Sequence, residues 1–330
     1  MPNSAPFRPG APLLGAGPYQ NGGFFSPPVP FDHQHVEPRL TTHLRSILAE
    51  YASVDNLTGP RPLLAMVPAQ LGFIEQLLCD AGGDDRRELL DVGARCAELV
   101  GWLSQDAGDL RAADYWSDRA MDYALALRDQ RLLSYVLMRK SNLASDGRDA
   151  ERALDLARQA LHEWDRLTPR LRAVALRQEA HAHALRGDTA ACARSLDRAM
   201  EQATSGRTGE PELDLTAYCT PSYLGMEAAA CWVQLGQPHR AVATLEQGLS
   251  SWPPEYKRDL RLCLARLALA HAAAGDAEQA YRVAQRALGI VKDTRSARTL
   301  RELWRLDTWL ANRRGLPAGM RLEGALAGLA

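Results

Sequence analysis

Apolar residues recur three and four positions apart along most of this chain, the spacing that places them on one face of an α-helix. Residues 37–56 show the pattern first, with apolar side chains at Leu40, Leu44, Ile47, Leu48 and Tyr51. Residues 60–83 continue this helical spacing of apolar residues. No stretch alternates apolar and polar residues with β-branched side chains over the length of a strand, so no sheet is predicted. We therefore expect an all-α protein.

Five glycine-containing breaks between these helices are followed by the same pattern: a small residue five positions after the glycine and another twelve positions after it. Gly108 is followed by Ala113 and Ala120 in this way. The other copies are Gly187 with Cys192 and Ala199, Gly236 with Ala241 and Gly248, Gly275 with Ala280 and Ala287, and Gly147 with Ala153 and Ala160 after a loop one residue longer. The second small position recurs at intervals of 40, 39, 49 and 39 residues. This self-similarity predicts five copies of one helix–turn–helix unit.

The paired small residues have a physical cause. Two antiparallel helices approach closely where their side chains are small, and residues seven apart lie on nearly one face. The second helix of each unit can then contact both its own partner and the next unit. Gly-Asp at a break, as in Gly108-Asp109, supplies the left-handed end of one helix and the N-cap of the next. The expected fold is a right-handed superhelical solenoid of helical hairpins.

These features resemble the tetratricopeptide-repeat family. The Gly-Asp turns, the paired small residues and Pro253, five residues after Gly248, match the family's pattern. The period is longer than the family's usual 34 residues, and most first helices lack its Trp/Gly/Tyr set. Longer helices in each unit would explain both departures. The resemblance covers about residues 85–292.

A narrower resemblance links residues 37–328 to the C-terminal part of actinobacterial helix-turn-helix transcriptional regulators. The similar segments are 51–78, 101–124, 135–144 and 298–326. The resemblance implies a tetratricopeptide sensor or interaction domain that acts in transcriptional control. We expect the family's DNA-binding domain to be missing from this chain, because too few residues precede the repeats to form one.

The domain organisation follows a change in composition. Residues 1–36 hold eight of the chain's 19 prolines and five glycines, which predicts a flexible N-terminal tail. Residues 37–330 form one tetratricopeptide-like repeat domain, with units at about 85–292 and capping helices within 294–328. Trp304, Leu306, Trp309 and Leu310 are expected to bury the last exposed face. The loop at 205–225, which lengthens one interval, either decorates a binding edge or is a tolerated surface insertion.

Charge and cysteine usage restrict the partners. The formal net charge is −1, which gives no general attraction to nucleic acid or to anionic lipid. The six cysteines are scattered without a CxxC pair, as expected of buried, reduced thiols. We find no cationic leader with an apolar run, and we expect no stretch long enough to span a bilayer. The sequence predicts a cytoplasmic protein that binds neither membrane nor nucleic acid directly and leaves homodimerisation open.

Signatures of catalysis and metal binding are absent from the sequence. There is no GxGxxG after a strand, no GxxxxGK[ST], no HExxH and no GxSxG. His181 and His183 are two apart, so on a helix they point about 200° apart and cannot share one ion. His33 and His35 lie in the proline-rich tail. We therefore assign no catalytic residue, no metal site and no cofactor.

The candidate ligand site is the concave groove of the solenoid, which the first helix of each unit lines. Counting back from each turn gives polar, aromatic and arginine side chains at eight groove positions: Trp102, Tyr135, Arg139, Asn142, Arg177, His181, Tyr223 and Glu227. Each has a simpler structural interpretation. The arginines are more often solvated or paired with acidic neighbours, the aromatic residues are often inter-repeat core, and a histidine is more often structural than a ligand.

Asn142 is the most specific of the eight. An asparagine in the middle of a helix carries a propensity cost, and its amide can both donate to and accept from a peptide backbone. In the peptide-binding tetratricopeptide domains that this chain resembles, an asparagine at this position often holds the ligand backbone.

Two functions of different classes follow. The first is a non-enzymatic regulatory protein that binds a peptide or protein segment in the groove, in transcriptional control as the resemblance implies. The alternative is a scaffold that assembles itself or another complex through its convex face, with no groove ligand.

Overall fold

The computed structural model describes residues 37–205, 215–250, 252, 256–291, 296–312 and 322–328. Within these residues every regular element is a helix, so the all-α prediction is confirmed. A single 3-10 turn, η1, spans Trp164–Arg166. The helices are α1 (Pro38–Thr58), α2 (Pro60–Leu64), α3 (Val67–Asp80), α4 (Gly83–Ala107), α5 (Leu110–Leu127), α6 (Gln130–Asp146), α7 (Ala150–Ala160), α8 (Pro169–Leu185), α9 (Thr189–Ser205), α10 (Pro221–Gln234), α11 (Pro238–Ser250), α12 (Lys257–Ala274), α13 (Ala277–Val291), α14 (Ala297–Ala311) and α15 (Glu323–Ala327).

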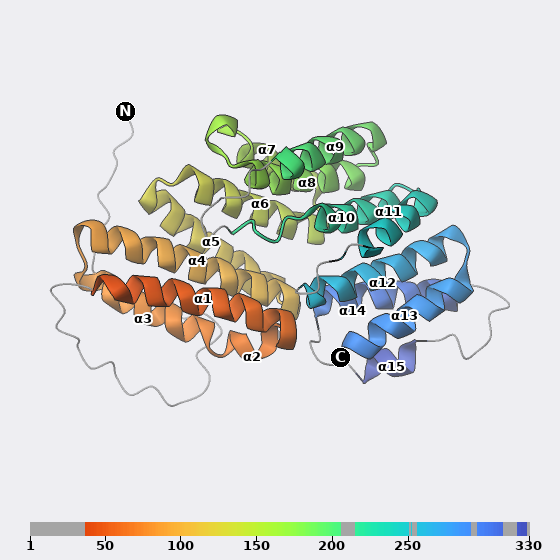
Figure 1. The fold of residues 1–330 in the computed structure, drawn as a ribbon, viewed down its shortest axis with the longest axis horizontal. Helices are drawn as coiled ribbons and strands as arrows, with labels where there is room; N and C mark the ends of the chain where they lie inside the picture. The colour runs from red at the N-terminus through yellow and green to blue at the C-terminus, as the bar shows by residue number, and fades with distance from the viewer. Residues whose placement is uncertain are drawn as a thin grey trace.

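The predicted units are consecutive helix pairs. Helices α4 and α5, α6 and α7, α8 and α9, α10 and α11, and α12 and α13 each pack together. The pairs follow one another along an arc from α4 to α13 (Figure 1). The tail at 1–36, Pro253 and residues 206–214 of the insertion lie outside the described residues.

The turns show why the spacing after each break is constant. Gly108 and Gly275 end α4 and α12 in the left-handed region, with φ of 92° and 95°. The Asp109 side chain then accepts a hydrogen bond from the Ala112 backbone N–H and caps α5. At the break between α6 and α7 the left-handed residue is Arg148, with φ of 60°, and not Gly147. Counted from Arg148, the small residues fall at the same five and twelve positions as elsewhere, so this loop is one residue longer but ends in the same way.

The small residues lie where the helices approach closely. The nine that carry a side chain, namely Ala113, Ala120, Ala153, Ala160, Cys192, Ala199, Ala241, Ala280 and Ala287, are 0–1% exposed. On the partner helix, a Cβ added to Gly101 would meet the Ala113 carbonyl oxygen at 3.4 Å. The predicted role of these positions in packing therefore holds.

Enlarging one of them should destabilise the stack. Ala120→Leu inserts three carbon atoms into a filled contact, and overpacking of this kind costs about 1–3 kcal/mol. Urea unfolding followed by circular dichroism measures the loss. The matched control is Ala126→Leu, because Ala126 is an exposed alanine on the same helix. An equal loss in both variants would contradict the packing role.

Residues 60–80 correct one expectation. By length and composition this segment is apolar enough to cross a membrane, with a mean hydropathy of 1.4, whereas we expected no such stretch. In the structure it forms two helices, α2 and α3, with a break at Ala65-Met66. Its side chains Leu63, Val67, Leu71 and Ile74 are buried in the hydrophobic cluster that α1–α6 share.

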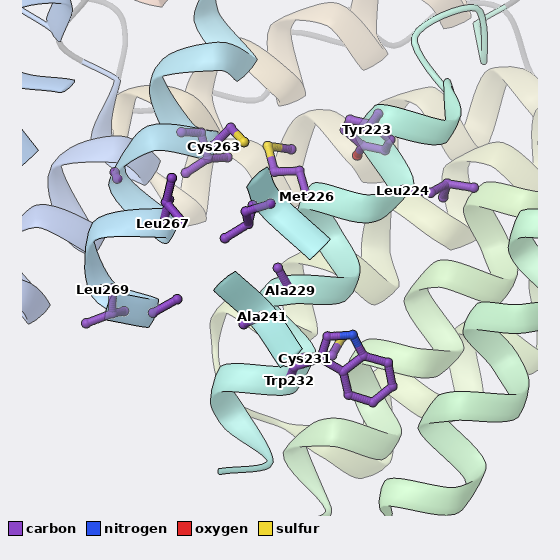
Figure 2. Close-up of a cluster of buried hydrophobic side chains, with 14 of the residues drawn as sticks. Tyr223, Leu224, Met226, Ala229, Cys231, Trp232, Ala241, Cys263, Leu267 and Leu269 are labelled. Carbon is purple, nitrogen blue, oxygen red and sulfur yellow. The ribbon is translucent and has the colours of Figure 1, made fainter. Parts of the chain in front are cut away.

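The hydrophobic core has two large parts that meet at α6. One contains the buried residues of α1–α5 together with Leu132 and Val136 of α6. The other begins at Tyr135 and Met138 of the same helix and runs through α8–α15. Figure 2 shows a section of the second part, where buried side chains of α10, α11 and α12 gather in one cluster.

The C-terminal helices do more than cap the last unit. Leu306 and Leu310 of α14 are buried as expected and Trp309 is half-buried, but Trp304 is 37% exposed, so its predicted burial is wrong. Helix α14 packs on α12 and also contacts α4, while α1 contacts α12. The two ends of the repeat array therefore meet.

Candidate functional site

A central cavity of about 390 Å³, partly open to solvent, lies where the two ends meet. Its wall is built from α1, α4, α6, α10, α12, α14 and residues 215–218, so helices from both ends of the chain contribute. Among its lining residues Leu48, Ala49 and Ala52 of α1 are aliphatic. The rest carries five aromatic side chains, five arginines and three acidic side chains: Trp102, Tyr135, Tyr218, Tyr223, Tyr256, Arg45, Arg95, Arg139, Arg258, Arg298, Asp55, Glu98 and Asp259.

Trp102 of α4 is surrounded by guanidinium groups. The Cζ atoms of Arg139, Arg258 and Arg298 lie 4.8, 4.6 and 4.4 Å from the centre of its ring, within the range of cation–π interaction. Its indole Nε1 donates a hydrogen bond of 3.1 Å to Oδ2 of Asp55 on α1. Trp102 is thus the point where side chains from α1, α6, α12 and α14 converge.

Three carboxylates hold the ends of the array together. Asp55 of α1 pairs with Arg258 of α12. Asp106 of α4 accepts from Ser296 Oγ at 2.7 Å and from Arg298 Nε at 3.0 Å. Asp146 of α6 accepts from Arg301 of α14 at 3.0 Å. We call these three pairs, Asp55–Arg258, Asp106–Arg298 and Asp146–Arg301, the closing contacts. The closing contacts are polar. The two parts of the hydrophobic core, by contrast, join through α6.

The arginines of the cavity wall are balanced by carboxylates beside or behind them. Arg139 Nε lies 3.1 Å from Glu98 Oε1, and Asp91 lies 3.2 and 3.1 Å from Arg45 and Arg95. Burial raises the pKa of Glu98 even though Arg139 lowers it. Burial also lowers the pKa of Arg258 to about 10, which leaves it charged at neutral pH. The cavity therefore offers both signs of charge side by side and is not a simple anion site.

Asn142 does not line this cavity. Its Oδ1 accepts from Gln105 Nε2 at 2.6 Å, and its Nδ2 donates at 2.8 Å to Gln178 in the amide orientation that satisfies both side chains. Gln105 also donates to Asp146 and accepts from Arg139. The amide that the sequence singled out for a ligand backbone thus has internal partners on both its atoms.

Glu227 is the centre of a second buried network. Its carboxylate lies 3.2 Å from Arg177, 2.8 Å from Arg266 and 3.1 Å from His181 Nε2. Burial alone would raise the pKa of Glu227, but the Arg266 guanidinium, His181 and Arg177 hold it well below its ordinary value. This group is therefore an ionised carboxylate that two cations stabilise.

The eight predicted residues thus fall into two sets. Trp102, Tyr135, Arg139 and Tyr223 line the cavity. Asn142, Arg177, His181 and Glu227 form polar networks packed behind it. Counting back from the turns did not identify Asp55, Arg258 and Arg298. These three residues lie on α1, α12 and α14, which are outside the first four repeat units. Within the described residues no group of three or more His, Cys, Asp or Glu side chains is placed to hold a metal ion.

Comparison with known proteins bears on the fold. No family model and no curated protein matches the chain. Among solved structures it is similar to a Rap protein complexed with Competence and Sporulation Factor, with 13% identity over 88% of this chain and 85% of that one and a TM-score of 0.53. It is also similar to BtubC (BKLC) from P. vanneervenii, with 15% identity over 79% of this chain and 95% of that one and a TM-score of 0.47.

The fold is an all-α helical repeat of the tetratricopeptide type. The helix pairs, their Gly-Asp turns and the likeness to the Rap protein agree on this. At 13% identity the likeness extends to the fold and not to individual site residues.

Proposed function

We propose that this protein is a non-enzymatic regulatory protein that binds a short peptide, or a short segment of a protein, in the central cavity. The observation that carries the proposal is the cavity itself. Its volume of about 390 Å³ lies within the range of roughly 300–1,000 Å³ that is usual for ligand pockets. Five of the residues on its wall are aromatic in a chain with 6% aromatic residues, and aromatic and arginine side chains dominate binding energy in protein recognition.

Two further arguments support a peptide as the ligand. The wall has both aliphatic residues and charges of both signs, which suits a segment with apolar side chains and a polar backbone. The Rap protein of similar fold was solved in complex with Competence and Sporulation Factor. We further propose that this protein is cytoplasmic, acts in transcriptional regulation and does not itself contact nucleic acid.

Ligand binding would act through the closing contacts. A ligand in the cavity touches helices from both ends of the array, so it changes the relative stability of states in which those ends are together or apart. A partner protein or a second copy of the chain would then bind the outer surface more strongly or more weakly.

Native mass spectrometry of the protein purified gently from its own host tests the proposal. We expect a bound mass on the wild type and on Trp304→Leu, which alters an exposed tryptophan that does not line the cavity. The mass should be absent from Trp102→Leu, while thermal melting confirms that this variant is folded. A bound mass that Trp102→Leu retains would place the ligand elsewhere. A homo-oligomer with no other mass attached would favour the scaffold function through the convex face.

A further inference from the structure

Five arginines on the cavity wall suggest an anionic ligand, but each of them already has a carboxylate partner. The pairs are Arg258 with Asp55, Arg139 with Glu98 at 3.1 Å, Arg45 and Arg95 with Asp91 at 3.2 and 3.1 Å, and Arg298 with Asp106 and Asp259 at 3.0 and 3.5 Å. Glu88 lies 3.8 Å from Arg45, but its side chain is 47% exposed to solvent. Among the described residues, the wall therefore has no excess of positive charge.

The most exposed residues of the wall carry no charge. Ala49, Ala52 and Ser53 of α1 and Ala217, just before α10, are exposed and line the cavity. The charged residues of the wall are all buried or half-buried. A ligand that enters from solvent therefore meets uncharged side chains first.

Two tyrosines of the wall add neutral aromatic surface. The rings of Tyr218 and Tyr223 lie edge to face with their centres 5.0 Å apart. Burial raises the pKa of both hydroxyls well above the ordinary value, so neither ionises near neutral pH. A tyrosine ring offers a large apolar area together with one neutral polar group. The wall is thus suited to apolar contact with a few hydrogen bonds.

A charged group in this cavity would lose hydration without an equivalent gain. Burying an ion is favourable only where an opposite charge is available to pair with it. To bind an arginine of the wall, a ligand carboxylate would have to displace a carboxylate that the protein itself supplies. An uncharged group has no such cost and gains by burying apolar surface.

Resting on the proposed function of the cavity, we propose that the cavity accepts an uncharged, apolar segment of the peptide or protein. Charged side chains and free chain ends of the ligand stay outside it. The end of the 205–225 insertion that the structure describes contributes to this site through Ala217 and Tyr218. The insertion thus forms part of a binding edge.

A matched pair of dyes tests the charge preference. N-phenyl-1-naphthylamine is neutral, and 8-anilino-1-naphthalenesulfonate is the same molecule with one sulfonate. Fluorescence titration of the full chain at pH 7 measures both affinities. We expect the neutral dye to bind at least tenfold more tightly. Equal or tighter binding of the sulfonate, or no binding of either dye, would overturn the proposal.

One variant places the dye in the cavity. Ala52→Trp fills space beside an exposed alanine of the wall and should weaken binding of the neutral dye at least tenfold. The control is Ala126→Trp, since Ala126 is an exposed alanine of α5 that does not line the cavity. It should leave the affinity within twofold of wild type. Unchanged binding in Ala52→Trp would contradict the proposal.

Charge variants separate electrostatics from a general affinity for apolar dyes. Glu98→Gln leaves Arg139 without its carboxylate, and Asp91→Asn does the same to Arg45 and Arg95. Each should strengthen sulfonate binding at least tenfold and change the neutral dye less than twofold, with thermal melting to confirm folding. Glu278→Gln alters the net charge equally on the exposed face of α13 and should have no effect. Wild-type affinity for the sulfonate in both cavity variants would contradict the balanced wall.

Capped peptides extend the test to both signs of charge. We would displace the neutral dye with N-acetylated, C-amidated tetrapeptides whose two central residues are both leucine, both glutamate or both lysine, flanked by alanines. The leucine peptide should compete at least tenfold better than the other two, and better than the same peptide with free ends. Stronger competition by the glutamate or the lysine peptide would overturn the proposal.

The two proposals can fail separately. A charged peptide found on the host-purified protein and absent from Trp102→Leu would keep the cavity as a peptide site and remove its preference for an uncharged segment. A cavity that prefers the neutral dye and responds to Glu98→Gln, but releases the dye to no peptide, would keep the neutral site and remove the peptide.

Discussion

Replacing Glu227 with alanine should lower the free energy of unfolding by roughly 3–5 kcal/mol, the cost of removing one partner from a buried ion pair. The Arg177 and Arg266 guanidinium groups would remain buried without the carboxylate that faces them at 3.2 and 2.8 Å. Urea unfolding at pH 7 measures the loss. The control is Glu246→Ala, because Glu246 is exposed and lies 3.8 Å from His271; its loss should stay below about 1 kcal/mol.

The pH dependence of that loss identifies its cause. The folded protein holds the pKa of Glu227 well below its ordinary value of 4.5. A carboxyl group whose pKa is lowered by folding contributes its full stability above the unfolded pKa and loses it as the pH falls. The difference between wild type and Glu227→Ala should therefore be complete at pH 7 and shrink below pH 4.5. A constant difference down to acid pH would mean that lost packing, and not charge, explains the effect.

Replacing Asp106 with alanine should both destabilise the protein and free α14 from α4. Asp106 is fully buried and accepts from Ser296 and Arg298, so its removal leaves a buried cation that has lost its nearest carboxylate. We expect a loss of about 3 kcal/mol, in the range found when one member of a buried pair is removed. Amide hydrogen exchange should rise most in α14.

A matched comparison for Asp106 is Glu278→Ala. Glu278 pairs with Arg282 on the exposed face of α13, and such a surface pair contributes little. Equal protection of α14 in wild type and Asp106→Ala would show that this closing contact does not hold the ends together.

Local rules explain how much of the fold was predictable. A glycine with positive φ, a capping aspartate and a small residue at a close helix contact each depend on neighbours within one or two turns, so Gly108, Asp109 and Ala113 could be interpreted from the sequence. Arg148 marks the limit. It adopts a conformation that favours glycine, and its residue type does not indicate that it, rather than Gly147, takes the left-handed position after α6.

The site was predictable as far as it follows the repeats. Trp102, Tyr135 and Tyr223 were found by counting back from a turn, because every first helix presents the same positions to the inside. Asp55 and Arg258 were not found, because they meet through the overall curvature of the array. The overall curvature results from many small rotations between neighbouring units. No short stretch of the sequence determines their total.

The closing contacts also limit how the chain can change its number of repeats. An open solenoid gains or loses a unit easily, because each unit contacts its immediate neighbours. Here the arc must have the length that brings Asp55 to Arg258 and Asp106 to Arg298. Deleting α8 and α9 would remove one step of the arc and misalign both pairs at once. Copy number, which is free in most arrays of this kind, is therefore fixed in this one by the need of its first and last helices to meet.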